Sequence, residues 1–176
     1  MKIFGRGLGV PAEITARAGL GSRETVLAAA SSEDGTWLLG TREALVVVGA
    51  EPVRIPWQRV EASDWNRESG RLRVTEVADF GMPRARHEFA MDNPADLLQL
   101  VRERVTATVL MQRRVTLAGR RGFFVIARRA PGGDGEITWA FRFDPGVDPA
   151  DPAISAAADQ ALALAQDELG DVGRPI

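Results

Sequence analysis

Short runs of apolar residues that alternate with polar ones fill the first half of the chain, and this pattern predicts antiparallel strands. Residues that favour turns, above all Ser, Asp and Gly, separate the runs. Six strands are expected before residue 92, at 25–30, 36–40, 44–48, 53–65, 72–77 and 84–91. Pro52 and Pro56 confine the fourth of these strands to a sheet edge or a bend, because proline donates no hydrogen bond to a neighbouring strand.

A helix is expected over residues 94–112, where the apolar spacing lengthens to four. The expected apolar stripe consists of Leu97, Val101, Val105 and Val109. Asn93 is the expected N-cap, and Pro94 suits the first helical position. Arg113 and Arg114 then fall in the last turn, where the helix dipole favours cations.

From Val115 the apolar spacing returns to two, which predicts a three-stranded meander. Its strands are expected at 115–118, 123–128 and 137–143. Three aromatic residues of the last strand are expected to share one face of the sheet: Trp139, Phe141 and Phe143. An alanine-rich helix at about 152–169 follows, and its small residues allow close packing on that face.

Three segments carry a resemblance to a known family: Trp37-Leu38-Leu39-Gly40-Thr41-Arg42-Glu43-Ala44-Leu45-Val46-Val47, Ile55-Pro56-Trp57-Gln58-Arg59-Val60 and Gly70-Arg71-Leu72-Arg73-Val74. With the order of elements up to residue 112, they resemble bacterial pleckstrin-homology-like domains of the actinobacterial type. The family pattern has seven strands where six are expected here. Its phosphoinositide-binding members use basic residues in the first hairpin. In this chain that hairpin, Ser31–Gly35, is acidic and would repel a phosphate, so a phosphoinositide ligand is not expected.

The expected fold class is therefore α+β. Residues 1–112 are expected to form an antiparallel pleckstrin-homology-like sheet or half-barrel capped by its C-terminal helix. Residues 113–176 lie outside the resemblance and are expected to form a βββα appendage. This appendage is either a separate domain or part of the same packed unit.

The composition excludes several kinds of chemistry. The chain has 176 residues with no cysteine and one histidine, His87, so it offers no disulfide, no thiolate nucleophile and no multi-histidine metal centre. It also has no Gly-x-Ser-x-Gly nucleophile motif, and His87 is expected to pack within or beside the core. We therefore expect no enzymatic activity, no metal and no cofactor.

The chain has no apolar run long enough to span a bilayer, so membrane insertion is not expected. Residues 1–6 lack the apolar core of a signal peptide, and the cytoplasm is the expected location.

The formal net charge of −2 conceals a strong segregation of charge. Residues 101–129 carry eight arginines and one acidic residue, and residues 130–176 carry nine acidic residues and two arginines. Three arginine doublets in the basic segment form the candidate interaction patch: Arg113, Arg114, Arg120, Arg121, Arg128 and Arg129. These arginines could be solvated or paired with the acidic segment, or they could bind a protein or a polyanion such as nucleic acid.

Two functions follow as expectations. The first is a non-enzymatic cytoplasmic interaction module that binds a protein partner or associates with itself, because the sheet can offer open edges. The second is a polyanion or nucleic-acid binder that uses the arginine doublets of residues 113–129.

Overall fold

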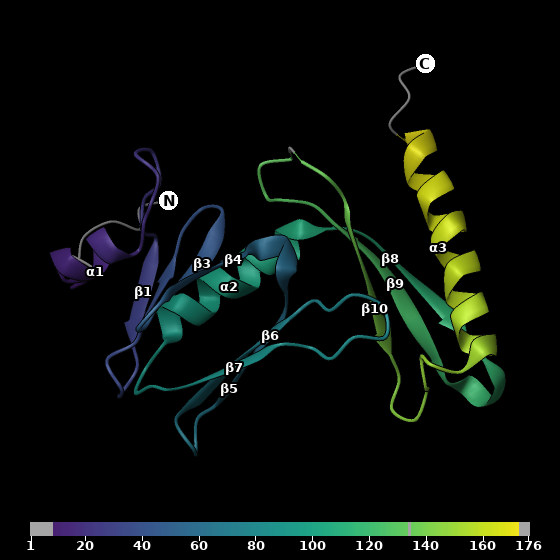
Figure 1. Ribbon diagram of the computed structural model, residues 1–176, viewed down its shortest axis with the longest axis horizontal. Coiled ribbons are helices and arrows are strands. Elements are labelled where there is room, and N and C mark those ends of the chain that lie inside the picture. The colour runs from purple at the N-terminus through teal and green to yellow at the C-terminus, as the bar shows by residue number, and fades with distance from the viewer. Residues whose placement is uncertain (1–8, 134, 173–176) are drawn as a thin grey trace.

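The computed structural model describes residues 9–133 and 135–172 (Figure 1). Its elements are α1 (Ala12–Arg17), β1 (Ala28–Ser31), β2 (Trp37–Gly40), β3 (Ala44–Val48), β4 (Pro52–Pro56), the 3₁₀ turn η1 (Trp57–Arg59), β5 (Val60–Asn66), β6 (Arg71–Glu76), β7 (Arg86–Ala90), α2 (Ala95–Thr108), β8 (Val109–Thr116), the 3₁₀ turn η2 (Ala118–Arg120), β9 (Gly122–Arg128), β10 (Thr138–Phe143) and α3 (Pro152–Val172). The strands form three antiparallel sheets, ordered β1-β2-β3-β4, β5-β6-β7 and β10-β9-β8. The expected α+β class is confirmed, and none of the described sheets closes into a barrel. None of the described helices is both long and apolar enough to cross a bilayer.

The first two sheets enclose one core, which helix α2 closes. The α2 residues in this core are Leu97, Leu98, Leu100 and Val101. They pack on residues of both sheets, among them Leu38, Leu45, Leu72 and Val74. Gly40 lets the helix approach β2 closely, because a Cβ atom at this position would lie 2.5 Å from Cδ2 of Leu100.

The N-terminal segment covers the other face of the four-stranded sheet. Ile14 and Ala18 pack on Leu39, Val46 and Val48. Every residue of β3 is consequently buried. A polar network holds the chain that follows α1, since Glu24 accepts hydrogen bonds from Thr41 (2.6 Å) and from both Nη atoms of Arg54 (2.8 and 2.9 Å).

The expectation of six strands before the helix is wrong, because the described residues ahead of α2 already form seven. Pro56 ends β4, and η1 turns the chain so that the expected strand 53–65 becomes β4 and β5 in two different sheets. Trp57, which is fully buried, fixes this turn by donating from Nε1 to the carbonyl of Thr41 at 3.1 Å.

The expected helix over residues 94–112 is wrong at its C-terminal end, because α2 ends at Thr108. The Thr108 hydroxyl donates to the carbonyl of Val105 at 2.6 Å, and the chain is extended from Val109 onward. The expected N-cap at Asn93 is also wrong, since Pro94 occupies that position and no side chain caps the helix. Arg113 and Arg114 therefore lie on strand β8 and not in a helical turn.

The expected meander and final helix are present, although β8 begins at Val109 and not at Val115. Helix α3 covers one face of the β10-β9-β8 sheet (Figure 1). The buried residues of this contact are Phe123 and Val125 from β9 and Ala158, Ala161 and Ala165 from α3. Small residues bring the helix axis close to the aromatic face, as the sequence predicts.

The other face of this sheet packs against the second sheet and the end of α2. Ile126 and Ala140 pack on Val77, and the buried side chain of Arg128 reaches across the junction. Its Nη1 donates to the Val60 carbonyl (3.2 Å) and to the Thr108 hydroxyl (3.1 Å). Burial lowers the pKa of Arg128 below its ordinary value, and the nearby Glu61 carboxylate partly opposes this effect.

Replacing Arg128 with methionine keeps much of the apolar volume but leaves buried acceptors at Val60 and Thr108 without this donor. We expect Arg128→Met to lower the free energy of unfolding by about 1–3 kcal/mol, measured by urea denaturation. Arg129→Met is the control, since the Arg129 side chain makes one hydrogen bond among the described residues, a long 3.5 Å contact with the Gly133 carbonyl. We expect this control to change stability by less than about 0.5 kcal/mol. Equal stability of the two variants would contradict the structural role of Arg128.

Candidate interaction surface of the β8–β10 sheet

The six arginines of the candidate patch are spread along the whole β8–β9 hairpin. Arg113 lies opposite Val125 and Arg114 opposite Phe124, within the hairpin. Arg128 lies opposite Val109 at the open end, and Arg120 and Arg121 lie at the turn. The doublets 113–114 and 128–129 therefore do not gather at one end of the hairpin.

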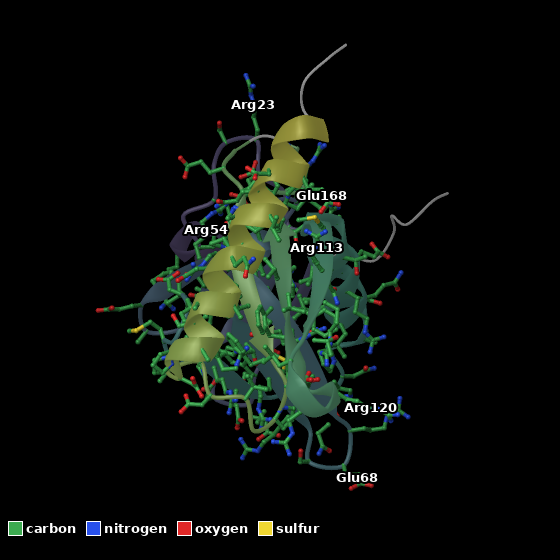
Figure 2. The ribbon with its side chains drawn as sticks, turned by 90° about the vertical axis from the view of Figure 1, so that its right-hand side faces the viewer. Arg23, Arg54, Glu68, Arg113, Arg120 and Glu168 are labelled. Atoms are coloured by element: carbon green, nitrogen blue, oxygen red, sulfur yellow. The ribbon has the colours of Figure 1, made fainter. Side chains whose placement is uncertain are left out.

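The members of the first doublet point to opposite faces of the sheet, as consecutive residues of a strand do. Arg113 points toward α3, where its Nη1 lies 3.2 Å from Oε2 of Glu168 (Figure 2). Arg114 lies on the other face and makes a two-pronged pair with Asp144, with N–O distances of 2.9 and 2.6 Å. The acidic C-terminal segment therefore neutralises both arginines within the chain.

Asp144 is held by several donors at the end of β10. The hydrogen bond from Arg114 lowers the pKa of Asp144 below its ordinary value of 3.8, and the Gly122 amide at 2.9 Å acts in the same direction. The same pair raises the pKa of Arg114. Asp144 thus ties all three strands of the sheet together at this end.

Phe124 lies between two guanidinium groups on the face opposite α3. The Cζ atoms of Arg114 and Arg142 are 4.8 and 4.6 Å from its ring centroid. All three residues occupy one cross-strand row, since Phe124 is the register partner of both arginines. Sequence reasoning missed Arg142. Its position between Phe141 and Phe143 nevertheless predicts a side chain on the face of the strand opposite these aromatic residues.

The second and third doublets have different surroundings. Arg120 and Arg121 are exposed at the turn, where Arg120 adopts a positive φ of 71°. Within residues 9–133 and 135–172, the side chains of Arg120, Arg121 and Arg142 form no ion pair. Arg128 is buried at the junction between sheets, so it is not available to a partner.

Strand β8 forms an open outer edge of its sheet. It is the longest of the strands at sheet edges, and no described strand pairs with its outer side. Leu110 in this strand is 43% exposed. Sequence reasoning missed this edge, because it assigned residues 109–112 to a helix.

The opposite edge of the same sheet is covered. The Phe141 carbonyl of β10 accepts a hydrogen bond from Arg84 Nη2 at 3.3 Å. The ring of Phe80 packs against Phe141 with 5.1 Å between centroids. A shallow groove of about 270 Å³ remains beside this contact, lined by Phe80, Met82, Pro83, Phe141, Phe143 and Pro149, among others. Other sheet edges are shorter or, like β4, bounded by prolines.

The described residues hold no group of three or more side chains that could bind a metal ion. His87 is half-buried on β7, and its Nε2 lies 2.7 Å from Oε1 of Glu76. The same two strands also carry an ion pair between Arg73 and Glu88 at 2.8 Å.

Comparison of the chain with protein-family models, with curated proteins and with solved structures gives no match. The functional argument therefore depends on the geometry of the β8–β10 sheet.

The Asp144–Arg114 pair makes a direct pH prediction. Because the pKa of Asp144 is lowered in the folded protein, its stabilising contribution is present above the ordinary value of 3.8 and is lost as the pH falls through the lower folded value. We expect carbon-detected NMR titration of the Asp144 carboxyl to give a pKa below 3.8 in the wild type. In Arg114→Gln the pKa should move upward, and an unchanged value would contradict the role of Arg114.

Proposed function

We propose that this protein is a non-enzymatic interaction module in which the outer edge of β8 takes up an extended protein segment as an additional strand. The open edge carries the proposal, because unpaired N–H and C=O groups along eight residues form a ready template for a further strand. The covered β10 edge makes β8 the side on which the sheet can grow.

The charges beside the edge indicate the chemistry of the partner segment. Arg113 and Arg114 flank the edge on its two faces and remain partly exposed despite their pairing, with side-chain exposures of 44% and 34%. Acidic side chains on an added strand could share these guanidinium groups, since each has several donors. Leu110 offers an apolar contact at the start of the strand. A segment that alternates apolar and acidic residues places all its acidic side chains on one face of the sheet, where they can meet Arg113, and its apolar side chains on the opposite face.

We also propose a pleckstrin-homology-like scaffold, in a cytoplasmic protein, for the unit that ends with α2. Seven antiparallel strands in sheets of four and three, followed by one helix, support this interpretation. The loop between β1 and β2 carries Glu33 and Asp34, and Asp34 accepts a hydrogen bond from the Thr36 amide at 2.9 Å. Such a loop offers no cation to a phosphoinositide.

A polyanion such as nucleic acid is the second candidate ligand. The observation in its favour is the cationic end of the hairpin, where Arg120 and Arg121 follow β8 and Arg142 stacks on Phe124. The negative charge of Asp144 lies beside these cations and would repel a polyanion. The internal pairing of Arg113 and Arg114 and the burial of Arg128 leave fewer cations than the sequence suggests.

The proposed strand addition predicts binding of an eight-residue peptide that alternates valine and glutamate. Binding should slow amide hydrogen exchange at alternate residues within 109–116, because the amides that point away from β9 gain new main-chain hydrogen bonds. Arg113→Glu should weaken binding at least about tenfold, or about 1.4 kcal/mol, in calorimetric titrations.

Arg86→Glu is the matched control, since Arg86 is exposed on β7 in a different sheet and the charge change is the same. We expect this control to bind the peptide like the wild type. Protection of β7 in place of β8, or equal losses in both variants, would rule out the β8 edge as the docking strand.

The second candidate predicts retention on heparin at low salt, with elution that shifts steeply with salt concentration. The double variant R120A/R121A should elute at lower salt, because phosphate and sulfate groups would lose two cations. The double variant R23A/R67A removes two exposed arginines from other regions and should elute like the wild type. Absence of retention at low salt would eliminate this candidate.

A further inference from the structure

We infer that Glu168 of helix α3 is an internal competitor of the partner segment, because it already occupies Arg113, the guanidinium that an acidic added strand would use. The inference rests on the proposed function, since it concerns the regulation of the same β8 edge. Nη1 of Arg113 lies 3.2 Å from Oε2 of Glu168 (Figure 2). A partner carboxylate that takes up Arg113 must therefore replace one that the chain itself supplies.

Arg113 is the charged residue that β8 presents on the α3 face of the sheet. Met111 and Val115, two positions away on either side, pack against the core beneath α3, so Arg113 points to the same side. Arg114 points to the opposite side of the sheet. A strand added beside β8 alternates in the same way. Its side chains on the α3 face therefore come to lie beside Arg113 and Glu168.

The two arginine–carboxylate pairs of β8 differ in how firmly they are held. Arg114 and Asp144 share two N–O contacts, of 2.9 and 2.6 Å, and Asp144 also accepts a hydrogen bond from the Gly122 amide at 2.9 Å. The side chains of Arg113 and Glu168 are more exposed, at 44% and 53%. An ion pair exposed to this degree adds little to stability, so an incoming carboxylate can replace Glu168 at small cost. Arg113 is therefore the exchangeable cation of the edge.

Two carboxylates on the guanidinium of Arg113 would oppose each other. A guanidinium has enough N–H donors for both, but two carboxylates bound to one such group lie close together, and like charges at short distance repel. An acidic partner segment thus binds either with the Glu168 side chain turned away or against its charge. In both cases the negative charge of Glu168 lowers the affinity for an acidic segment.

The exchange requires the Glu168 side chain to move and leaves helix α3 in place. Apolar contacts between the buried alanines of α3 and strand β9 hold the helix on the sheet. Glu168 lies near the C-terminal end of α3, where the helix dipole does not favour a negative charge. Neutralising Glu168 therefore frees Arg113 without removing a contact on which the fold depends.

Glu168→Gln tests the competition with the eight-residue peptide that alternates valine and glutamate. In calorimetric titrations the variant should bind this peptide about two- to fivefold more tightly than the wild type, the range expected for release of a partly exposed ion pair. Asp167→Asn is the matched control, because it removes the same charge from an exposed neighbour that forms no ion pair within the described residues. This control should bind like the wild type. An equal gain in both variants would overturn the inference, since it would reflect only the total charge of the protein.

A double-mutant cycle identifies Arg113 as the group for which the carboxylates compete. In the Arg113→Gln background, Glu168→Gln should no longer change the affinity, because no guanidinium is left to release. A gain that persists in this background would overturn the inference. A peptide that alternates valine and glutamine carries no side-chain carboxylate, so the wild type and Glu168→Gln should bind it equally. Tighter binding of this neutral peptide by the variant would also overturn the inference.

Hydrogen exchange in the same samples separates failure of the inference from failure of the proposed function. If the valine–glutamate peptide protects β8 amides while the wild type and Glu168→Gln bind it with equal affinity, strand addition stands and the competition is overturned. If neither protein binds the peptide, both the inference and the proposed function are contradicted.

Discussion

The C-terminal sheet is joined to the rest of the protein around one buried cation. Arg128 ends strand β9 and places its guanidinium against the first residues of β5 and the last residue of α2. Both partner segments depart from regular pairing there, with register shifts at Val60/Ala62 and at Val109/Met111. Such irregularities leave backbone carbonyls without strand partners, and an arginine can satisfy several of them at once. The C-terminal sheet is therefore attached to the first unit by a polar contact inside an apolar junction.

That attachment determines which surfaces of the C-terminal sheet remain accessible. One face is partly covered because Arg128, Ile126 and Ala140 point toward the first unit. The other face lies under α3. The β10 edge meets the segment that contains Phe80 and Arg84. The outer side of β8 is left as the long polar backbone surface of this sheet, and the interaction argument follows from this geometry.

Apolar periodicity predicted the fold class, the final helix and the order of the elements, because these depend on burial patterns that repeat over many residues. The prediction failed where the same apolar residues fit both the helical spacing of four and the strand spacing of two. Val105 and Val109 fit a helical stripe, yet Val109, Met111 and Val115 equally fit one face of a strand. The choice is made at Thr108, whose hydroxyl bonds to the Val105 carbonyl and accepts from Arg128. Arg128 comes twenty residues later, so no local pattern could show it.

The sequence shows that the six arginines of the candidate patch are close along the chain, but it does not show where their side chains lie in space. Adjacent residues of a strand face opposite sides, so the doublet Arg113–Arg114 is divided between Glu168 and Asp144. The acidic segment that follows made such pairing a reasonable expectation, although the choice of partners depends on how α3 crosses the sheet. Arg128 binds neutral carbonyls and a hydroxyl, which carry no charge signal in the sequence.

The pairing of these arginines also bears on why the edge can accept another strand. Charged side chains and β-bulges are the usual means by which proteins prevent edge-to-edge association. On β8 the bulge lies between Val109 and Met111, and the register with β9 is regular from Met111 to Thr116. The two arginines in that regular part are drawn away from the edge, one toward α3 and one over Phe124, and each meets a carboxylate. Their charges are therefore compensated before a partner arrives, and the repulsion that would protect the edge is reduced where the backbone is most regular.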